Sequence, residues 1–104
     1  GLARGGSHVI VYTIAPFCYA RPFEQIRNDL CHDALPVTLV GNGGGYGYGV
    51  MGPSHHALED CAVMDAIGLK VYSPCFDNDV AVSLQGENKG PSYIRLSIDR
   101  KPQI

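Results

Sequence analysis

The chain has 104 residues, a formal net charge of −2 and a hydrophobic fraction of 45%, which together suit one small folded domain and leave no room for a second. Its Lys and Arg residues form no cluster, which argues against sequence-independent binding of nucleic acid, and no apolar run approaches the roughly 20 residues that span a bilayer. The four cysteines contain no C-x-x-C pair, which argues against a zinc site and favours free thiols in a reducing cytoplasm.

Four short apolar runs predict β-strands. The first, His8–Ile14, is rich in β-branched residues and is expected to be buried on both faces. The other three predicted strands are Pro36–Asn42, Lys70–Pro74 and Ser92–Ile98.

Helical patterns separate the predicted strands. They cover Arg21–Asp33, His55–Gly68 and Asn78–Gln85, and we expect Ser54 to cap the second helix and Gly68 to close it. Strands that alternate with helices through short connections indicate crossover units. The predicted fold class is therefore α/β, a doubly wound and mainly parallel sheet flanked by helices. Three helices are few for such a sheet, so the sheet is either small or completed by missing sequence. We expect a single, partial domain over residues 1–104.

Two segments follow strands at the edge where open parallel sheets bind ligands. One is Ala15–Phe17, and the other is the glycine-rich run Gly41–His56, which leads toward a predicted helix start. The glycines favour a tightly turned loop beside a site over a flexible linker, because a linker would interrupt a compact alternation. A nucleotide phosphate loop is disfavoured, since the run lacks the Lys-Ser/Thr ending of a P-loop.

Three ordered segments carry a resemblance to a known family. They read "YTIAPF…RPFEQIRND" (Tyr12–Asp29), "GPSHHALEDCAVM" (Gly52–Met64) and "GPSYIRLS" (Gly90–Ser97). This set resembles the pyrimidine-binding domain of transketolase-type thiamine diphosphate enzymes, which include transketolase and deoxyxylulose-phosphate synthase. The resemblance implies that the cofactor lies between this domain and a diphosphate-binding domain, in a homodimer or with a separate subunit. Thiamine diphosphate and Mg²⁺ would then be held largely by that partner, with no metal site in this chain.

The resemblance also implies roles for individual residues. Phe17 matches the aromatic residue that packs on the aminopyrimidine ring, and Tyr19 follows it in the same cofactor-binding segment. Arg21 matches a position at the substrate mouth. His55 matches the histidine that reaches the substrate near the reactive carbon, as a catalytic and substrate-binding residue. Each of these side chains also has an ordinary structural alternative, such as a core Phe or a solvated first-turn His.

Some features depart from the family pattern. Met51 stands where transketolases carry an acidic residue that holds a sugar hydroxyl, and Ile98 is the nearest match to a phosphate-gripping arginine, with Arg100 two residues on. Both point to a small sugar or keto substrate that is less polar.

The catalytic glutamate of the family is expected upstream of Gly1, and the diphosphate-binding motif is absent. The predicted function is thus the pyrimidine-binding part of a transketolase-like enzyme that transfers a two-carbon ketol unit and is not competent alone. The alternative is a non-catalytic dimerisation or partner-binding module.

Overall fold

The computed structural model of the chain contains one parallel sheet; it describes residues 1–85 and 90–97. The four strands are β1 (Val9–Ile14), β2 (Val37–Asn42), β3 (Lys70–Tyr72) and β4 (Ser92–Leu96). They lie in the order β1-β2-β4-β3, and every neighbouring pair is parallel. The predicted α/β class with a mainly parallel sheet is confirmed. Expectations that involve residues 86–89, Ile98 or Arg100 lie outside the described residues.

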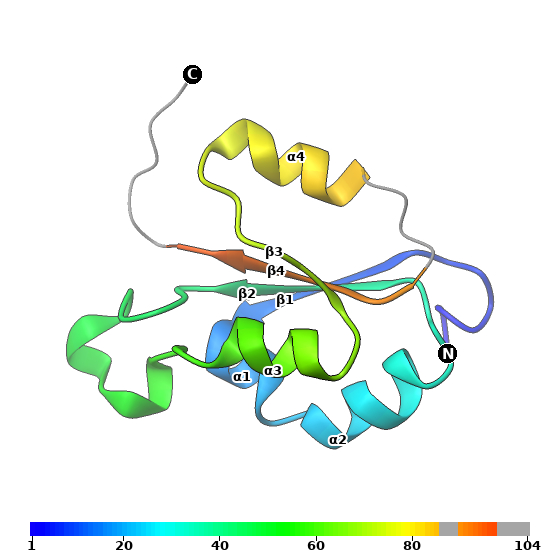
Figure 1. Cartoon of the computed structure of the whole chain (residues 1–104), viewed down its shortest axis with the longest axis horizontal. Coiled ribbons are helices and arrows are strands. Elements are labelled where there is room, and N and C mark those ends of the chain that lie inside the picture. Colours follow the sequence, from blue (N-terminus) through cyan, green and yellow to red (C-terminus); the bar gives the residue numbers. More distant parts are fainter. Residues whose placement is uncertain (86–89, 98–104) are drawn as a thin grey trace.

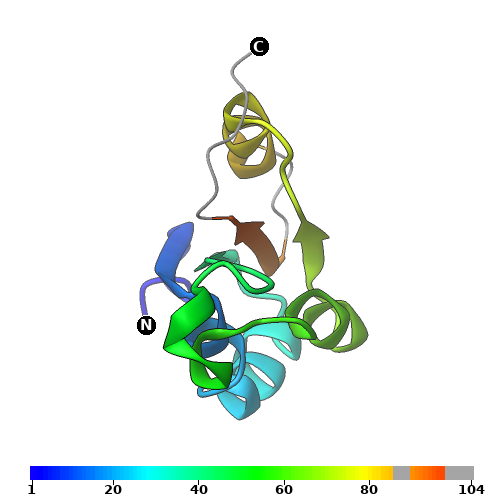
Figure 2. The ribbon, with the colours of Figure 1, turned by 90° about the vertical axis from the view of Figure 1, so that its left-hand side faces the viewer.

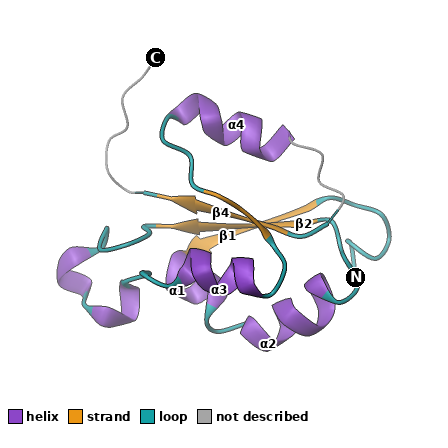
Figure 3. Ribbon diagram, in the orientation of Figure 1, coloured by secondary structure: helices purple, strands orange, loops and turns teal. Residues whose placement is uncertain are grey.

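The helices cover the two faces of the sheet unequally (Figures 1 and 3). On one face lie α1 (Ala15–Tyr19), α2 (Phe23–Gln25) with the π-helix η1 (Ile26–Cys31), and α3 (Asp60–Ala66). On the other face lies α4 (Asp77–Gln85), which stands above β4 and away from β1 (Figure 2). The hydrophobic core therefore fills the helix-rich face, where Leu39 and Tyr93 pack with Ala15, Ile26 and Met64.

Strand β1 corrects the expectation of a strand buried on both faces. Among the described strands it lies at the edge of the sheet, where it pairs with β2 alone. Its side chains Ile10 and Tyr12 alternate onto the face of α4, and they are 54% and 62% exposed because α4 does not reach them. An unbroken apolar run thus arises here on a strand that is largely open to solvent.

Two segments that follow β1 differ from the expected structure. The segment Ala15–Phe17, expected as a loop, opens the short helix α1, in which Pro16 suits the first turn. The helix expected over Arg21–Asp33 is instead α2 followed by the π-helix η1. These changes place Phe17 on a helix packed against β1 and β2.

The helix expected from His55 begins five residues later, at Asp60, so Ser54 does not cap it. Residues Pro53–His55 form a 3₁₀ turn, η3, and Ala57 pairs in antiparallel fashion with Gly45. The backbone of Ala57 is committed to that pairing and cannot continue a helix. The predicted end is confirmed: Gly68 has φ +104°, its N–H donates to Asp65 O, and Leu69 N–H donates to Met64 O.

Candidate functional site

The carboxyl ends of β1 and β2 bring two aromatic rings into contact. Phe17 follows β1 on α1, and His55 lies in η3 at the end of the glycine-rich run. Their ring centroids are 5.1 Å apart with an interplanar angle of 69°, an edge-to-face arrangement. Tyr48 lies 5.9 Å from His55, and the guanidinium carbon of Arg21 lies 4.2 Å from the centre of the Phe17 ring. Phe17 and Arg21 thus form one cluster with His55, which is far from both of them in the sequence.

Hydrogen bonds orient the two adjacent histidines. His55 Nδ1 lies 2.9 Å from Ser54 Oγ. His56 Nε2 donates to the carbonyl oxygen of Gly49 at 2.9 Å, and its ring packs edge-on against Tyr46 at 4.9 Å. The hydrogen bond to Gly49 ties His56 to the loop, and the two imidazoles serve different contacts.

The glycines of the loop make room for side chains of the same chain. A β-carbon on Gly43, which has φ +73°, would overlap the ring of Tyr48. A β-carbon on Gly44 would lie 2.6 Å from Cγ and 2.7 Å from Cδ of Arg95. The close backbone approach that the sequence predicts is therefore an approach to the protein's own tyrosine and arginine.

A buried carboxylate lies beneath the loop, and no sequence pattern predicted it. Asp60, the first residue of α3, is fully buried. Tyr93 Oη donates to Asp60 Oδ2 at 2.6 Å, Arg95 Nε donates to the same oxygen at 3.2 Å, and an Arg95 terminal nitrogen donates to Oδ1 at 2.9 Å. The one available sequence signal was that Tyr93 and Arg95 alternate onto the same face of a predicted strand.

The buried carboxylate changes the acidity of its neighbours. Burial, the hydrogen bond to Asp60 and the charge of Asp60 all raise the pKa of Tyr93, so its hydroxyl stays protonated as a donor. Burial, with a smaller contribution from Asp60, raises the pKa of Cys18 to about 11. Neither group is available as a nucleophile at neutral pH.

A cavity of about 350 Å³ lies against the ring cluster. Phe17, Tyr19 and Arg21 line it from the α1 side, and Ser54, His56 and Glu59 line it from the loop side. Tyr19 is otherwise buried, and its hydroxyl donates to the carboxylate of Glu59. Met51 does not line this cavity; it lies in the 3₁₀ turn η2 (Gly49–Met51) with 55% of its surface exposed.

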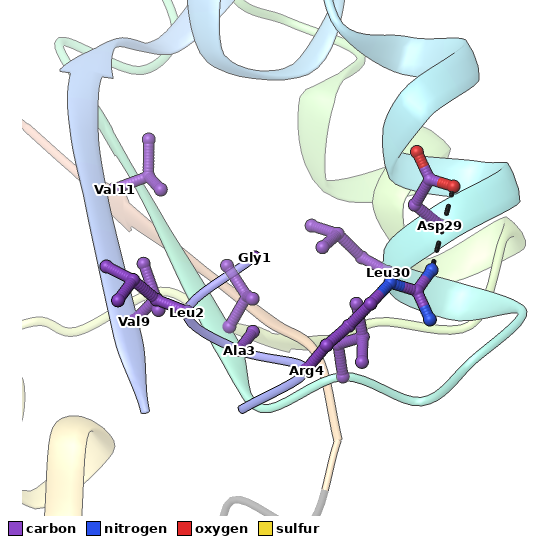
Figure 4. A pocket seen from close by; sticks show the side chains of 10 residues that line it. Gly1, Leu2, Ala3, Arg4, Val9, Val11, Asp29 and Leu30 are labelled. Carbon is purple, nitrogen blue, oxygen red and sulfur yellow. Dashed lines mark ion pairs between the residues drawn. The ribbon is translucent and has the colours of Figure 1, made fainter. Parts of the chain in front are cut away.

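A larger cavity of about 480 Å³ lies at the opposite end of β1 (Figure 4). Its walls are mainly aliphatic, with Leu2, Val11 and Leu30 pointing into it. Its two charged residues, Arg4 and Asp29, pair with each other at 3.9 Å. Its lining residues include no imidazole or thiol. A third cavity, of about 320 Å³, is lined by Cys31 and Lys70 among others. Of these three cavities, only the one against the ring cluster has a histidine in its lining.

Residues 1–85 and 90–97 contain no group of three or more His, Cys, Asp or Glu side chains arranged to hold a metal ion. None of the helices in the same two ranges has the length and apolar character that a membrane crossing requires.

The fold and the ring cluster at its strand ends define an α/β protein with a candidate ligand site at the carboxyl edge of a parallel sheet. Comparison with known proteins then gives the family. The family model described as "Transketolase, pyrimidine binding domain" matches residues 1–100. The chain belongs to this family.

Individual relatives agree with that assignment. An apulose-4-phosphate transketolase subunit of Actinobacillus succinogenes is 33% identical over 107 residues, which cover 100% of this chain and 34% of the relative. The 1-deoxy-D-xylulose-5-phosphate synthase of Mycobacterium ulcerans is 39% identical over 75 residues, covering 71% of this chain and 12% of the synthase. A solved structure of a split-gene transketolase, described as an inactive beta4 tetramer, superposes with a TM-score of 0.84 at 31% identity, over 100% of this chain and 34% of that one. The chain spans about a third of the length of the first and third of these proteins, so it corresponds to one part of them.

Proposed function

We propose that the chain is the pyrimidine-binding part of a thiamine-diphosphate-dependent, transketolase-like enzyme that transfers a two-carbon ketol unit. The observation that carries the proposal is the contact between Phe17 and His55, with ring centroids 5.1 Å apart at the ends of two parallel strands. An apolar ring beside an imidazole suits a heteroaromatic cofactor beside a hydroxylated substrate. Membership of the transketolase pyrimidine-binding family supports the same assignment.

The described residues fit one half of the cofactor. The half-buried Phe17 ring and the cavity of about 350 Å³ suit an aminopyrimidine ring. The described residues hold no group of three or more His, Cys, Asp or Glu side chains that could bind Mg²⁺. We assign Mg²⁺ and the diphosphate that it accompanies to a partner domain. When bound, thiamine diphosphate supplies the carbanion stabilisation that bond cleavage next to a carbonyl requires.

Each predicted residue then has a role. Phe17 and Tyr19 shape the cofactor-facing wall, and Arg21, stacked on Phe17, flanks the entrance with a positive charge. His55 uses Nδ1 toward Ser54, so we assign Nε2 to a substrate hydroxyl. Met51, exposed one residue before the Gly52 turn, is assigned to the substrate mouth. The charge of Arg21 favours a polar or anionic substrate group at the entrance, while the apolar side chain of Met51 favours a less polar part of the substrate.

The partner is proposed to be a diphosphate-binding domain on a second copy or on a separate subunit. The relative from Actinobacillus succinogenes is named as a subunit of its transketolase, and the solved neighbour is a split-gene protein. Exposed apolar side chains in the loop, including Tyr46 and Val50, suit coverage by another polypeptide. The four free cysteines suit a reducing cytoplasm.

Calorimetric titration of thiamine diphosphate and Mg²⁺ into the protein together with its diphosphate-binding partner tests the proposal. Phe17→Ala should weaken binding about 2–13-fold, the equivalent of an aromatic contact of about 0.5–1.5 kcal/mol. The matched control is Tyr12→Ala, which removes an exposed aromatic ring from the opposite face of β1 and should leave the affinity unchanged. His55→Ala should leave cofactor binding intact and lower kcat/KM about 10–100-fold. Equal affinities for Phe17→Ala and Tyr12→Ala would refute the assignment, and cofactor binding with no turnover would favour the non-catalytic module.

A further inference from the structure

The loop that carries His55 closes at a narrow neck. There the N–H of Gly45 donates to Ala57 O at 2.7 Å, and the N–H of Ala57 donates to Gly45 O at 3.0 Å. The neighbouring Gly44 N–H donates to Leu96 O of β4 at 2.9 Å. Ala57 is fully buried and lies two residues after His55. The position of this neck therefore sets where η3 and the His55 ring emerge.

The guanidinium of Arg95 joins the neck to the core. One of its terminal nitrogens donates to both the carbonyl oxygen of Ala57 and Oδ1 of Asp60. Its Nε donates to Asp60 Oδ2. The Ala57 carbonyl thus accepts from the opposite strand of the neck and from β4 at once. Three elements, namely β4, the start of α3 and the loop neck, meet on one side chain.

The position is built for arginine in particular. The carboxylate of Asp60 is fully buried and has to be matched by a charge. The planar guanidinium of arginine can donate to both oxygens of that carboxylate and also to a carbonyl beside it. The compact ammonium group of lysine cannot make the same set of hydrogen bonds. Gly44 leaves open the space that the Arg95 stem occupies, since a β-carbon there would lie 2.6 Å from Arg95 Cγ.

We propose that Arg95 is a positioning residue, which fixes His55 against Phe17 by tying the Ala57 carbonyl to the buried Asp60. His55 itself touches the rest of the site through ring contacts with Phe17 and Tyr48. Such contacts are weak unless the backbone beneath them is held, and displacement of a site residue by about 1 Å can cost 100-fold in rate. The inference rests on the proposed function insofar as His55 meets the substrate.

The first test follows the neck without any activity, in the complete protein with its partner. Arg95→Lys keeps a charge beside Asp60 but gives up the planar guanidinium. Gly44→Ala keeps Arg95 unmutated but pushes its side chain aside. It is the variant to test if Arg95→Lys fails to fold. Both should speed hydrogen exchange of the Gly45 and Ala57 amides at least 10-fold while the Leu39 amide of β2 is unchanged. Tyr93→Phe, which removes a different Asp60 donor, is the matched control and should show no selective change at the neck. Unchanged exchange rates of the Gly45 and Ala57 amides, or an equal increase at the Leu39 amide, would overturn the proposal. Arg95 would then only stabilise the fold as a whole.

The second test asks whether Arg95 acts through His55. With hydroxypyruvate as the ketol donor, Arg95→Lys should lower kcat/KM about 10-fold in the parent protein and less than 2-fold in the His55→Ala background. The apparent cofactor affinity should stay within 2-fold, because Phe17 stands on α1 and not on the loop. Equal losses in both backgrounds would overturn the positioning role. Failure of the parent protein to turn over would count against the proposed function, while the exchange measurement would still decide the role of Arg95 at the neck.

Discussion

Gly41 offers a sharp test of how the buried carboxylate is packed. It lies in β2 beside β4, and a β-carbon there would sit 3.0 Å from Cε1 and Cζ of Tyr93 and closer still to its hydroxyl. Tyr93 is fully buried, and its hydroxyl is fixed by the 2.6 Å bond to Asp60. The ring therefore cannot yield without breaking that bond. Gly41→Ala should be strongly destabilising although its backbone conformation is one that alanine adopts.

The magnitude follows from the overlap. Forcing one methyl group into a well-packed core costs about 1–3 kcal/mol, and the fixed Tyr93 hydroxyl places Gly41→Ala near the upper end. Tyr93→Phe removes a hydrogen bond to a charged acceptor, with an expected cost of about 1.5–3 kcal/mol. Because Phe lacks the oxygen that meets the new methyl group, the double variant should be about 1 kcal/mol more stable than the sum of the two single changes predicts.

Pulse proteolysis across a urea series, with β4 peptides quantified by mass spectrometry, measures these free energies of unfolding in the complete protein. Gly90→Ala is the matched control, because a β-carbon there meets nothing within 4 Å; it should change stability by less than about 0.5 kcal/mol. Equal midpoints for Gly41→Ala and Gly90→Ala, or strict additivity with Tyr93→Phe, would show that the Tyr93 hydroxyl is not held as described.

Three other predictions concern separate parts of the molecule. Gly68→Ala should cost about 1–3 kcal/mol in the same proteolysis assay, because φ +104° is strained for any residue with a β-carbon; a neutral effect would contradict the helix ending described. Cys18 has its pKa raised from 9.0 to about 11, so the folded state keeps a proton that the unfolded chain loses. The contribution of this thiol to the free energy of unfolding should be complete below pH 9 and disappear as the pH rises through 11. Between pH 8, 9 and 10, the urea midpoint of Cys18→Ala should therefore fall less steeply than that of the parent protein. Arg4→Ala should cost less than about 1 kcal/mol despite the 2.5 Å contact with Asp33, because the pair is exposed to solvent; a larger loss would show that the pair is better shielded than its exposure indicates.

Much of the fold could be read from the chain. Alternating apolar runs and helical patterns predicted a parallel α/β sheet, and all four strands appear within the predicted ranges as far as the structure describes them. The positive-φ end of α3 at Gly68 was also foreseen, because it depends on local backbone chemistry. The ordered family motifs likewise named Phe17 and His55, which the structure brings within 5.1 Å of each other. Their functional roles remain proposals.

Tertiary structure decided what local pattern could not. The run in β1 has the composition of a buried strand, yet the sheet order puts it at an edge where α4 does not cover Ile10 and Tyr12. The segment after His55 has helical periodicity, yet pairing of Ala57 with Gly45 across the loop neck delays the helix to Asp60.

The buried charge cluster was out of reach of the sequence for a related reason. Asp60 and Arg95 lie 35 positions apart, and their meeting depends on how α3 packs against β4. Composition and periodicity report which face a residue takes, since each depends on near neighbours along the chain. They do not report which distant side chain lies on the same face. A buried carboxylate needs a matching charge nearby, and Asp60 becomes buried only when the elements pack together.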